Sequence, residues 1–226
     1  KSAKIYKDLW TERGSPIIFH TKDLCEKLQS ILGDDYHVAY AMRYKNPSLK
    51  KTLQSWEGKN FKQIITLPLF PHYASATNGS VFEETMDVIK KWWVIPELSF
   101  VNQFYNEEFY LKGFEEKGKA HNFKDYDHVL FSFHGLPERH VDKVYKDGLC
   151  KDNDCENGIN EENVYCYKAT CFETAIQLAK RFNLKKEDYT VGFQSRLGSG
   201  WIEPFSDEII INLAKKGAKK LLVFSP

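Results

Sequence analysis

Short apolar runs rich in β-branched and aromatic residues recur along the chain. They lie at residues 36–42, 62–69, 98–104, 128–133, 189–195 and 220–225. Several runs are apolar at consecutive positions, which is typical of parallel strands buried on both faces. The pattern therefore predicts six β-strands.

The segments between these runs have the spacing of helices that bury one face. They cover residues 21–32, 47–57, 79–93, 106–120, 167–182 and 205–217. In the last of them, one stripe collects Ile209, Ile210, Leu213 and Ala214. Because parallel strands need a crossover helix between them, the alternation predicts an α/β fold with parallel sheets flanked by helices.

A polar stretch with little periodicity, residues 118–126, comes directly before the most apolar run. It is the best candidate for a domain boundary. We expect two Rossmann-like domains, residues 1–122 and 123–226, the second with a cysteine-rich insertion at 148–171. The chain opens without Met and stops soon after its last apolar run, so we expect it to be cut from a longer protein.

Charge and composition exclude several functions. The chain has 32 basic and 31 acidic side chains, a net charge of +1, so it has no basic field for nucleic acid. No apolar run approaches the roughly 20 residues that span a bilayer. Aromatic residues make up 15% of the chain, which suits a site for a flat apolar ligand, although each ring could equally fill a core.

In open α/β sheets, ligands lie outside the carboxyl ends of the strands. The run at 62–69 is followed by a segment ending at Ser80 that carries Ser75, Thr77 and Asn78. Their hydroxyl and amide groups stand at the start of a helix, where backbone N–H groups favour an anionic group such as a carboxylate. A well-capped helix without a ligand explains the same residues.

The run at 128–133 is followed at once by His134 and Gly135. An imidazole at the end of a strand can accept a proton near neutral pH or bind a metal, and glycine permits a tight turn after it. The alternative is a hydrogen-bonded structural histidine.

The run at 189–195 leads into a Gly-Ser-Gly loop that presents Trp201, before Pro204 and Ser206 begin the next helix. The indole could stack on a planar substrate at the same edge of the sheet. Packing of Trp201 on the sheet is the other interpretation.

These three segments, in their order and spacing, resemble the motifs of the ferrochelatase family. The matching residues are 67–80 (LPLFPHYASATNGS), 131–137 (FSFHGLP) and 194–208, with earlier matches at 10–16 (WTERGSP) and 42–47 (MRYKNP). The resemblance covers nearly the whole chain. It implies insertion of ferrous iron into protoporphyrin IX or coproporphyrin III during heme biosynthesis.

The resemblance also implies residue roles. His134 matches the family histidine that takes pyrrole protons or binds the Fe²⁺ substrate. The positions that match porphyrin-binding residues are Arg43, Tyr44, Tyr73, Ser75, Ser80 and Trp201. The family's acidic partner of the histidine lies beyond the strand that matches residues 221–224, and the family's first strand lies before residue 1. We therefore expect this chain alone to be an incomplete catalyst, with a first domain that lacks its N-terminal strand. A cobalt chelatase of the same fold and a non-catalytic heme or metal carrier stay as alternatives.

Four of the five cysteines fall in one short segment, at Cys150, Cys155, Cys166 and Cys171. Converging thiolates could hold an iron–sulfur cluster or zinc, and two disulfides are a third option. Some bacterial ferrochelatases carry a similar segment that binds a [2Fe–2S] cluster, so the resemblance favours the cluster, with zinc as the alternative. Cys25 lies on a helical stripe and is more typical of a core.

The partners that follow are a porphyrin and Fe²⁺, and not nucleic acid. With no secretory signal and no spanning segment, the resemblance implies a bacterial cytoplasmic protein that binds at most peripherally to the inner membrane. The sequence does not predict an oligomeric state.

Overall fold

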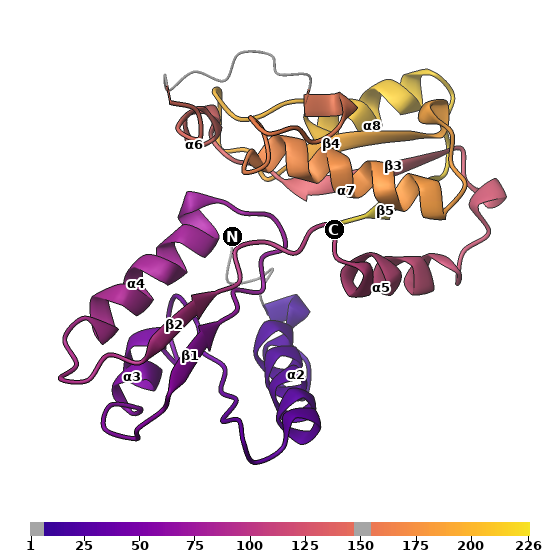
Figure 1. The fold of residues 1–226 in the computed structure, drawn as a ribbon. Coiled ribbons are helices and arrows are strands. Elements are labelled where there is room, and N and C mark those ends of the chain that lie inside the picture. The colour runs from indigo at the N-terminus through magenta and orange to yellow at the C-terminus, as the bar shows by residue number, and fades with distance from the viewer. Residues whose placement is uncertain (1–6, 147–154) are drawn as a thin grey trace. The chain divides into compact units, whose positions relative to one another are not determined.

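The computed structural model describes residues 7–146 and 155–226 as a chain of alternating helices and strands (Figure 1). The strands are β1 (Gln63–Thr66), β2 (Glu97–Phe100), β3 (His128–His134), β4 (Tyr189–Gln194) and β5 (Leu221–Phe224). The helices are α2 (Pro16–Leu32), α3 (Leu49–Gln54), α4 (Ser80–Ile89), α5 (Glu108–Gly118), α6 (Glu138–Asp142), α7 (Tyr167–Arg181) and α8 (Ser206–Lys215). The predicted α/β fold with parallel strands is confirmed.

The chain divides into two compact units. The first unit comprises residues 1–64 and 83–98, and the second comprises residues 65–82 and 99–226. The second unit thus takes in residues 99–122, which the sequence pattern assigns to the first domain. The division into domains at residues 122 and 123 stays a prediction.

The second unit is built on a parallel sheet with the order β4-β3-β5. In its register, Phe131 of the central strand pairs with Val191 on one side and with Phe224 on the other. Residues 129–133 are buried without interruption, and the strand becomes exposed only at His134. This is the burial that a continuous apolar run predicts for a strand covered on both faces.

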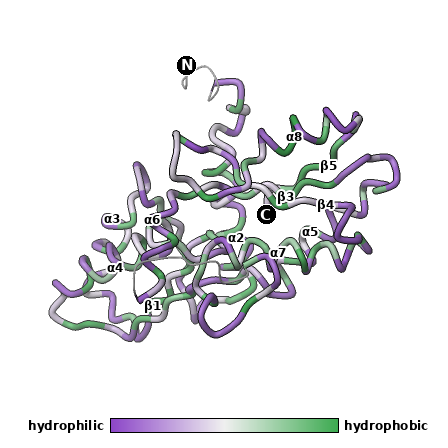
Figure 2. Tube along the Cα trace, turned by 90° about the horizontal axis from the view of Figure 1, so that it is seen from above, coloured by the Kyte–Doolittle hydropathy of each residue, from purple (hydrophilic) through white to green (hydrophobic). Residues whose placement is uncertain are grey.

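Helices cover both faces of this sheet. A side chain at Gly192 would meet Ile209 and Ser206 of α8, whereas the ring of Phe193 contacts Phe172 of α7. Successive side chains of a strand point to opposite faces, so α7 and α8 lie on opposite sides of β4. Figure 2 shows both hydrophobic and hydrophilic stretches along α8, in which Ile209 packs on Gly192 of β4 while Ile210 and Ile211 are exposed.

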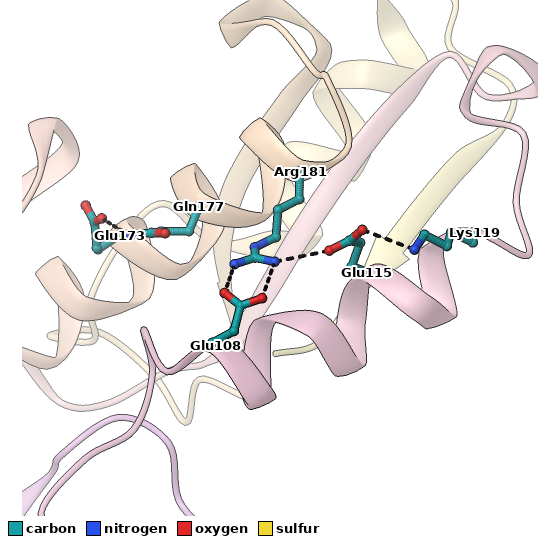
Figure 3. A network of polar contacts seen from close by, with 6 residues as sticks. All are labelled: Glu108, Glu115, Lys119, Glu173, Gln177 and Arg181. Atoms are coloured by element: carbon teal, nitrogen blue, oxygen red, sulfur yellow. Dashed lines mark hydrogen bonds and ion pairs between the residues drawn. The ribbon is translucent and has the colours of Figure 1, made fainter.

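Helices α5 and α7 are joined by an arginine between two carboxylates (Figure 3). Arg181 near the end of α7 pairs with Glu108 and with Glu115, which also contacts Lys119. The Arg181 side chain is only 23% exposed. Positive charge near the end of a helix also suits the helix dipole.

The first unit has a smaller core, formed by Leu53, Ile64, Val88, Ile89 and Trp92. The Lys62 carbonyl accepts from the Glu97 N–H, and four residues further along each strand the Thr66 carbonyl accepts from the Val101 N–H. This equal advance shows that β1 and β2 run parallel. The boundary between the units falls within both strands.

The strand expected at residues 36–42 is not formed, and that prediction is wrong. The Val38 N–H donates to the Gln29 side chain at 2.8 Å, and its carbonyl accepts from the Cys25 thiol at 3.4 Å. Side chains of α2 therefore take the place of a neighbouring strand. Met42 forms only an isolated bridge with Ser48.

Within residues 7–146 and 155–226, every helix falls short of the combined length and apolar character needed to cross a bilayer.

Candidate active site

The carboxyl end of β3 presents an exposed histidine above a buried strand. His134 is the last residue of β3 and is exposed, while Phe133 before it is 1% exposed. The Gly135 N–H donates to the Gln194 carbonyl at 2.7 Å. A Cβ on Gly135 would come within 2.8 Å of that same carbonyl oxygen, so the close approach of β3 and β4 here requires glycine.

The loop after β4 crosses beside this histidine. Pro137 and Trp201 form an antiparallel bridge, and the Ile202 N–H donates to the Leu136 carbonyl at 3.0 Å. A Cβ on Gly135 would lie 3.3 Å from the Trp201 ring. The half-buried indole is therefore the immediate neighbour of the residue that follows His134.

The segment after β1 reaches the same strand end through a buried histidine. The His72 ring lies edge-on to Phe133, with ring centres 5.3 Å apart, and its Nε2 is 2.9 Å from the Thr174 hydroxyl of α7. Burial lowers the pKa of His72 to about 3. His72 is therefore neutral at neutral pH and acts as a packing residue that brings residues 67–80 to the end of β3.

A π-helical turn, Ser75–Gly79, leads from this segment into α4. The buried Asn78 amide donates to the carbonyls of Phe70 and Asn102. The Ser80 hydroxyl donates to the Ala76 and Thr77 carbonyls, so it is used in the start of the helix. Turns of this kind are rare and occur often at functional sites.

Tyr73 and Ser75 lie close to Gly79 of this turn. A Cβ on Gly79 would be 3.1 Å from the Tyr73 hydroxyl and 3.6 Å from that of Ser75. The ring of Tyr73 also meets Tyr165 edge-on. The second unit therefore brings the three predicted segments, those of Tyr73, His134 and Trp201, to one end of its sheet.

Arg43 and Tyr44 belong to the first unit. The Arg43 guanidinium pairs with Glu84 at 3.0 Å and lies over the Tyr44 ring, 5.0 Å from its centre. Tyr44 itself is 72% exposed. The ion pair with Glu84 and the stacking on Tyr44 together fix the position of the Arg43 guanidinium.

Three of the four clustered cysteines are described, and all three are buried without a disulfide. Cys166 is the N-cap of α7. A hydrogen bond with Cys155, together with the backbone N–H groups of Ala169 and Lys168, lowers the pKa of Cys166 to about 6. Burial raises the pKa of Cys171. Cys150 lies outside the described residues.

This donor set fits a thiolate-bound group in part. Cys155 and Cys166 are in contact, and Cys166 is readily ionised, as a ligand to zinc or to an iron–sulfur cluster must be. Among residues 7–146 and 155–226, no three cysteine, histidine or acidic side chains converge as the ligands of one ion.

Two residues of this region are missing from the sequence-based site. His72 lies within the matched segment, but only its burial shows that it organises the loop. The Tyr167 hydroxyl donates to the His134 carbonyl at 2.8 Å, across 33 residues of sequence. No local pattern marks Tyr167, because its role depends on a contact between helix and strand end.

A parallel sheet flanked by helices defines this unit as an α/β protein, and its exposed imidazole and its indole lie at the carboxyl ends of the strands, where proteins of this class place their ligand sites.

Comparison with known proteins gives the family. The Ferrochelatase family model matches residues 1–226. The chain is 42% identical over 227 residues to the ferrochelatase of Legionella pneumophila strain Corby, covering all of this chain and 67% of that protein. It is 39% identical over 231 residues to the ferrochelatase of Coxiella burnetii strain Dugway 5J108-111, covering all of this chain and 64% of that protein. The chain belongs to the ferrochelatase family, and it spans about two thirds of the length of these relatives.

Proposed function

We propose that this chain carries the metal-inserting site of a ferrochelatase, which places ferrous iron in protoporphyrin IX or coproporphyrin III. Membership of the family supports the reaction. The observation that carries the assignment of the site is the exposed His134 at the end of a fully buried strand, with Trp201 beside it.

The chemistry requires a base next to the ring. As Fe²⁺ enters the macrocycle, two pyrrole N–H bonds break and their electron pairs become ligands to the iron, so two protons must leave. A neutral imidazole can accept such a proton at neutral pH. We assign this role to His134: because it is exposed, it can pass each proton to solvent and so accept the two protons in turn, and in its neutral form, before the first transfer, it binds the incoming Fe²⁺.

The remaining predicted residues hold the porphyrin. Trp201 offers an aromatic face, and Tyr73, Ser75 and Ser80 lie in or beside the π-helical turn, where hydroxyl groups meet a helix start. Arg43 is held by Glu84 with the exposed Tyr44 ring beside it, and we propose that its remaining N–H groups donate to a propionate.

Substitution of the histidine tests this function. In the intact protein, His134→Ala should abolish iron insertion, because the pyrrole protons lose their acceptor, while porphyrin binding measured by fluorescence quenching persists. His121→Ala removes another exposed imidazole, one that contacts Tyr126, and should leave turnover unchanged. Near-normal turnover of His134→Ala would remove this residue from the mechanism.

The choice of metal separates the alternatives. A Soret shift with Fe²⁺ and protoporphyrin or coproporphyrin identifies an iron chelatase, and the better substrate identifies the porphyrin. A shift that requires Co²⁺ and a different tetrapyrrole supports a cobalt chelatase. Porphyrin binding without any metal insertion supports a carrier.

We also propose that Cys150, Cys155, Cys166 and Cys171 hold a [2Fe–2S] cluster, with zinc as the alternative. Burial of the three described cysteines and the acidic thiol of Cys166 at the start of α7 support a thiolate site. When bound, the cluster supplies a covalent tie between Cys155 and α7. Anaerobically purified protein should show visible absorption bands with two irons and two sulfides per chain. One equivalent of zinc per chain, without visible absorption bands, would show that the site holds zinc and not the cluster. Cys166→Ser should remove the bound group, and Cys25→Ser is its matched control.

Peripheral membrane binding is proposed for the turn between α4 and β2. Trp93 is 99% exposed, Val94 and Ile95 follow it, and Lys90 and Lys91 precede it. Tryptophan prefers the membrane interface, and each lysine near anionic lipid adds about 1 kcal/mol, or roughly fivefold in binding. Vesicles containing phosphatidylglycerol should sediment the protein, and Trp93→Ala should weaken this binding. Leu197→Ala, an exposed apolar control in the other unit, should not.

A further inference from the structure

Tyr167 lies where three functional segments of the second unit meet. It is the first residue of α7 and follows the N-cap Cys166. Its hydroxyl donates to the His134 carbonyl at 2.8 Å, and its ring meets the His72 ring edge-on with centres 5.9 Å apart. One side chain therefore joins the cysteine segment, the end of β3 and the segment after β1.

The contact with His134 acts on a peptide group that is held at both ends. The His134 carbonyl and the Gly135 N–H belong to the same planar unit. Tyr167 binds the carbonyl, while the Gln194 carbonyl of β4 accepts from the N–H at 2.7 Å. Because both the carbonyl and the N–H of this peptide group are bound, rotation about the Cα–C bond of His134 is restricted. This fixes the backbone position from which the imidazole projects.

The same tyrosine is tied to the cysteines. Cys171 lies four residues after Tyr167 and so stands on the same face of the helix. Cys166 directly precedes Tyr167 as the N-cap, so all three residues belong to the start and the first two turns of α7. The position of the tyrosine therefore depends on the turn of α7 that bears Cys166 and Cys171.

We infer that Tyr167 is a positioning residue that couples the cysteine-bearing start of α7 to the catalytic orientation of His134. The inference rests on the proposed role of His134. It gives the cysteine site a function in the reaction: whatever the thiolates bind sets the first turn of α7, and Tyr167 passes that setting to the peptide after His134. The Tyr167 hydroxyl bonds to the His134 carbonyl, whereas it is the ring that faces the segment after β1 through His72.

The test removes only the hydroxyl. Tyr167→Phe in the intact protein keeps the ring against His72 and should lower kcat about three- to tenfold, the worth of one hydrogen bond. The KM for porphyrin, porphyrin affinity and any visible absorption of the cysteine site should stay as in the wild type. Tyr189→Phe, which removes a half-buried hydroxyl at the opposite end of β4, should leave kcat unchanged.

An unchanged kcat in Tyr167→Phe, or a rise in KM as large as the fall in kcat, overturns the inference. If the Phe variant does not fold, Cys171→Ala serves as the second variant, because it changes a proposed cluster ligand one turn after Tyr167 without touching His134. It should lower kcat and leave porphyrin affinity intact. Loss of porphyrin affinity with an unchanged kcat overturns the inference there too.

A double-mutant cycle tests the coupling itself. Cys166→Ser should cost clearly less in kcat when Tyr167 is already Phe than in the wild type, because the path to His134 is already broken. If Cys166→Ser lowers kcat by the same factor in the wild type and in Tyr167→Phe, the coupling is overturned. If His134→Ala retains turnover, the proposed function fails first. If that variant is inactive while Tyr167→Phe is normal, only the present inference fails.

Discussion

The two units build parallel strands from similar apolar runs but bury them very differently. Among the described residues, the core of the second unit contains eighteen buried apolar residues, and that of the first unit contains five. β3 has five buried residues in succession, whereas in β1 only Ile64 is buried. A strand covered on both faces ends in a fixed position, which suits β3 to hold the imidazole that we propose as the proton acceptor.

Two long helices show the same contrast. Both α2, with 17 residues, and α7, with 15, are amphipathic. α7 buries eight residues, while α2 has no buried residue, and its Ile31 is 81% exposed. An amphipathic pattern thus predicts the helix, but it does not say how much of the apolar stripe the fold covers.

The largest loss of stability is expected from a cavity in the second unit, which has the larger core. Phe131→Ala should lower the free energy of unfolding by about 3–5 kcal/mol, because Phe131 is 0% exposed in the central strand and its neighbours cannot close the space. Leu53→Ala, in the five-residue core, should cost less, near the lower end of about 2–5 kcal/mol. Urea unfolding of both variants checks the order. Equal costs would remove the contrast between the cores.

The stability of the second unit should depend on pH through His72. The pKa of His72 falls to about 3 on folding, so between about pH 6.5 and 3 the unfolded chain binds a proton that the folded chain excludes. Stability should therefore fall on acidification through this window, by at most about 1.4 kcal/mol per pH unit, and be insensitive to His72 above it.

Urea unfolding at several pH values isolates this effect when His72→Phe is compared with the wild type. The variant should lose the part of the slope that comes from the imidazole. The control His37→Phe, an exposed position in the first unit, should keep it. Parallel curves for His72→Phe and the wild type would show that the folded protein admits the proton.

The smallest change in stability is expected when either of two ion pairs is broken. Arg181→Gln breaks contacts with Glu108 and Glu115 between α5 and α7, where the arginine is 23% exposed. Arg13→Gln breaks a pair with Asp23 in which the arginine is 57% exposed. Exposed pairs contribute little and are screened by salt, so the urea midpoint should shift more for Arg181→Gln. A larger shift for Arg13→Gln would contradict this order.

Much of the fold could be predicted because its signals are local. The periodicities locate α2, α3, α4, α5, α7 and α8, and the apolar runs locate the five strands that form. The run at residues 36–42 has the composition of a strand but no strand beside it, since Gln29 and Cys25 of α2 bind the backbone of Val38 instead. Strand formation depends on a partner, and composition does not supply one.

The candidate site divides in the same way. The placement of His134 after an apolar run and the glycine that follows it could be read from the sequence. The contact of Trp201 with the Gly135 position, the burial of His72 against Phe133 and the bond from Tyr167 to the His134 carbonyl could not. Each joins residues far apart in the chain, and local patterns carry no information about such pairs.

The sequence by itself determined the family, the alternation of helices and strands, and the histidine at the end of the most apolar run, because spacing and side-chain type fix these locally. The tertiary structure decided which strand lies at the centre, which thiols come into contact, and which tyrosine holds the peptide after His134. These depend on how helices pack across the sheet, where burial and hydrogen-bond geometry select among contacts that the sequence permits equally.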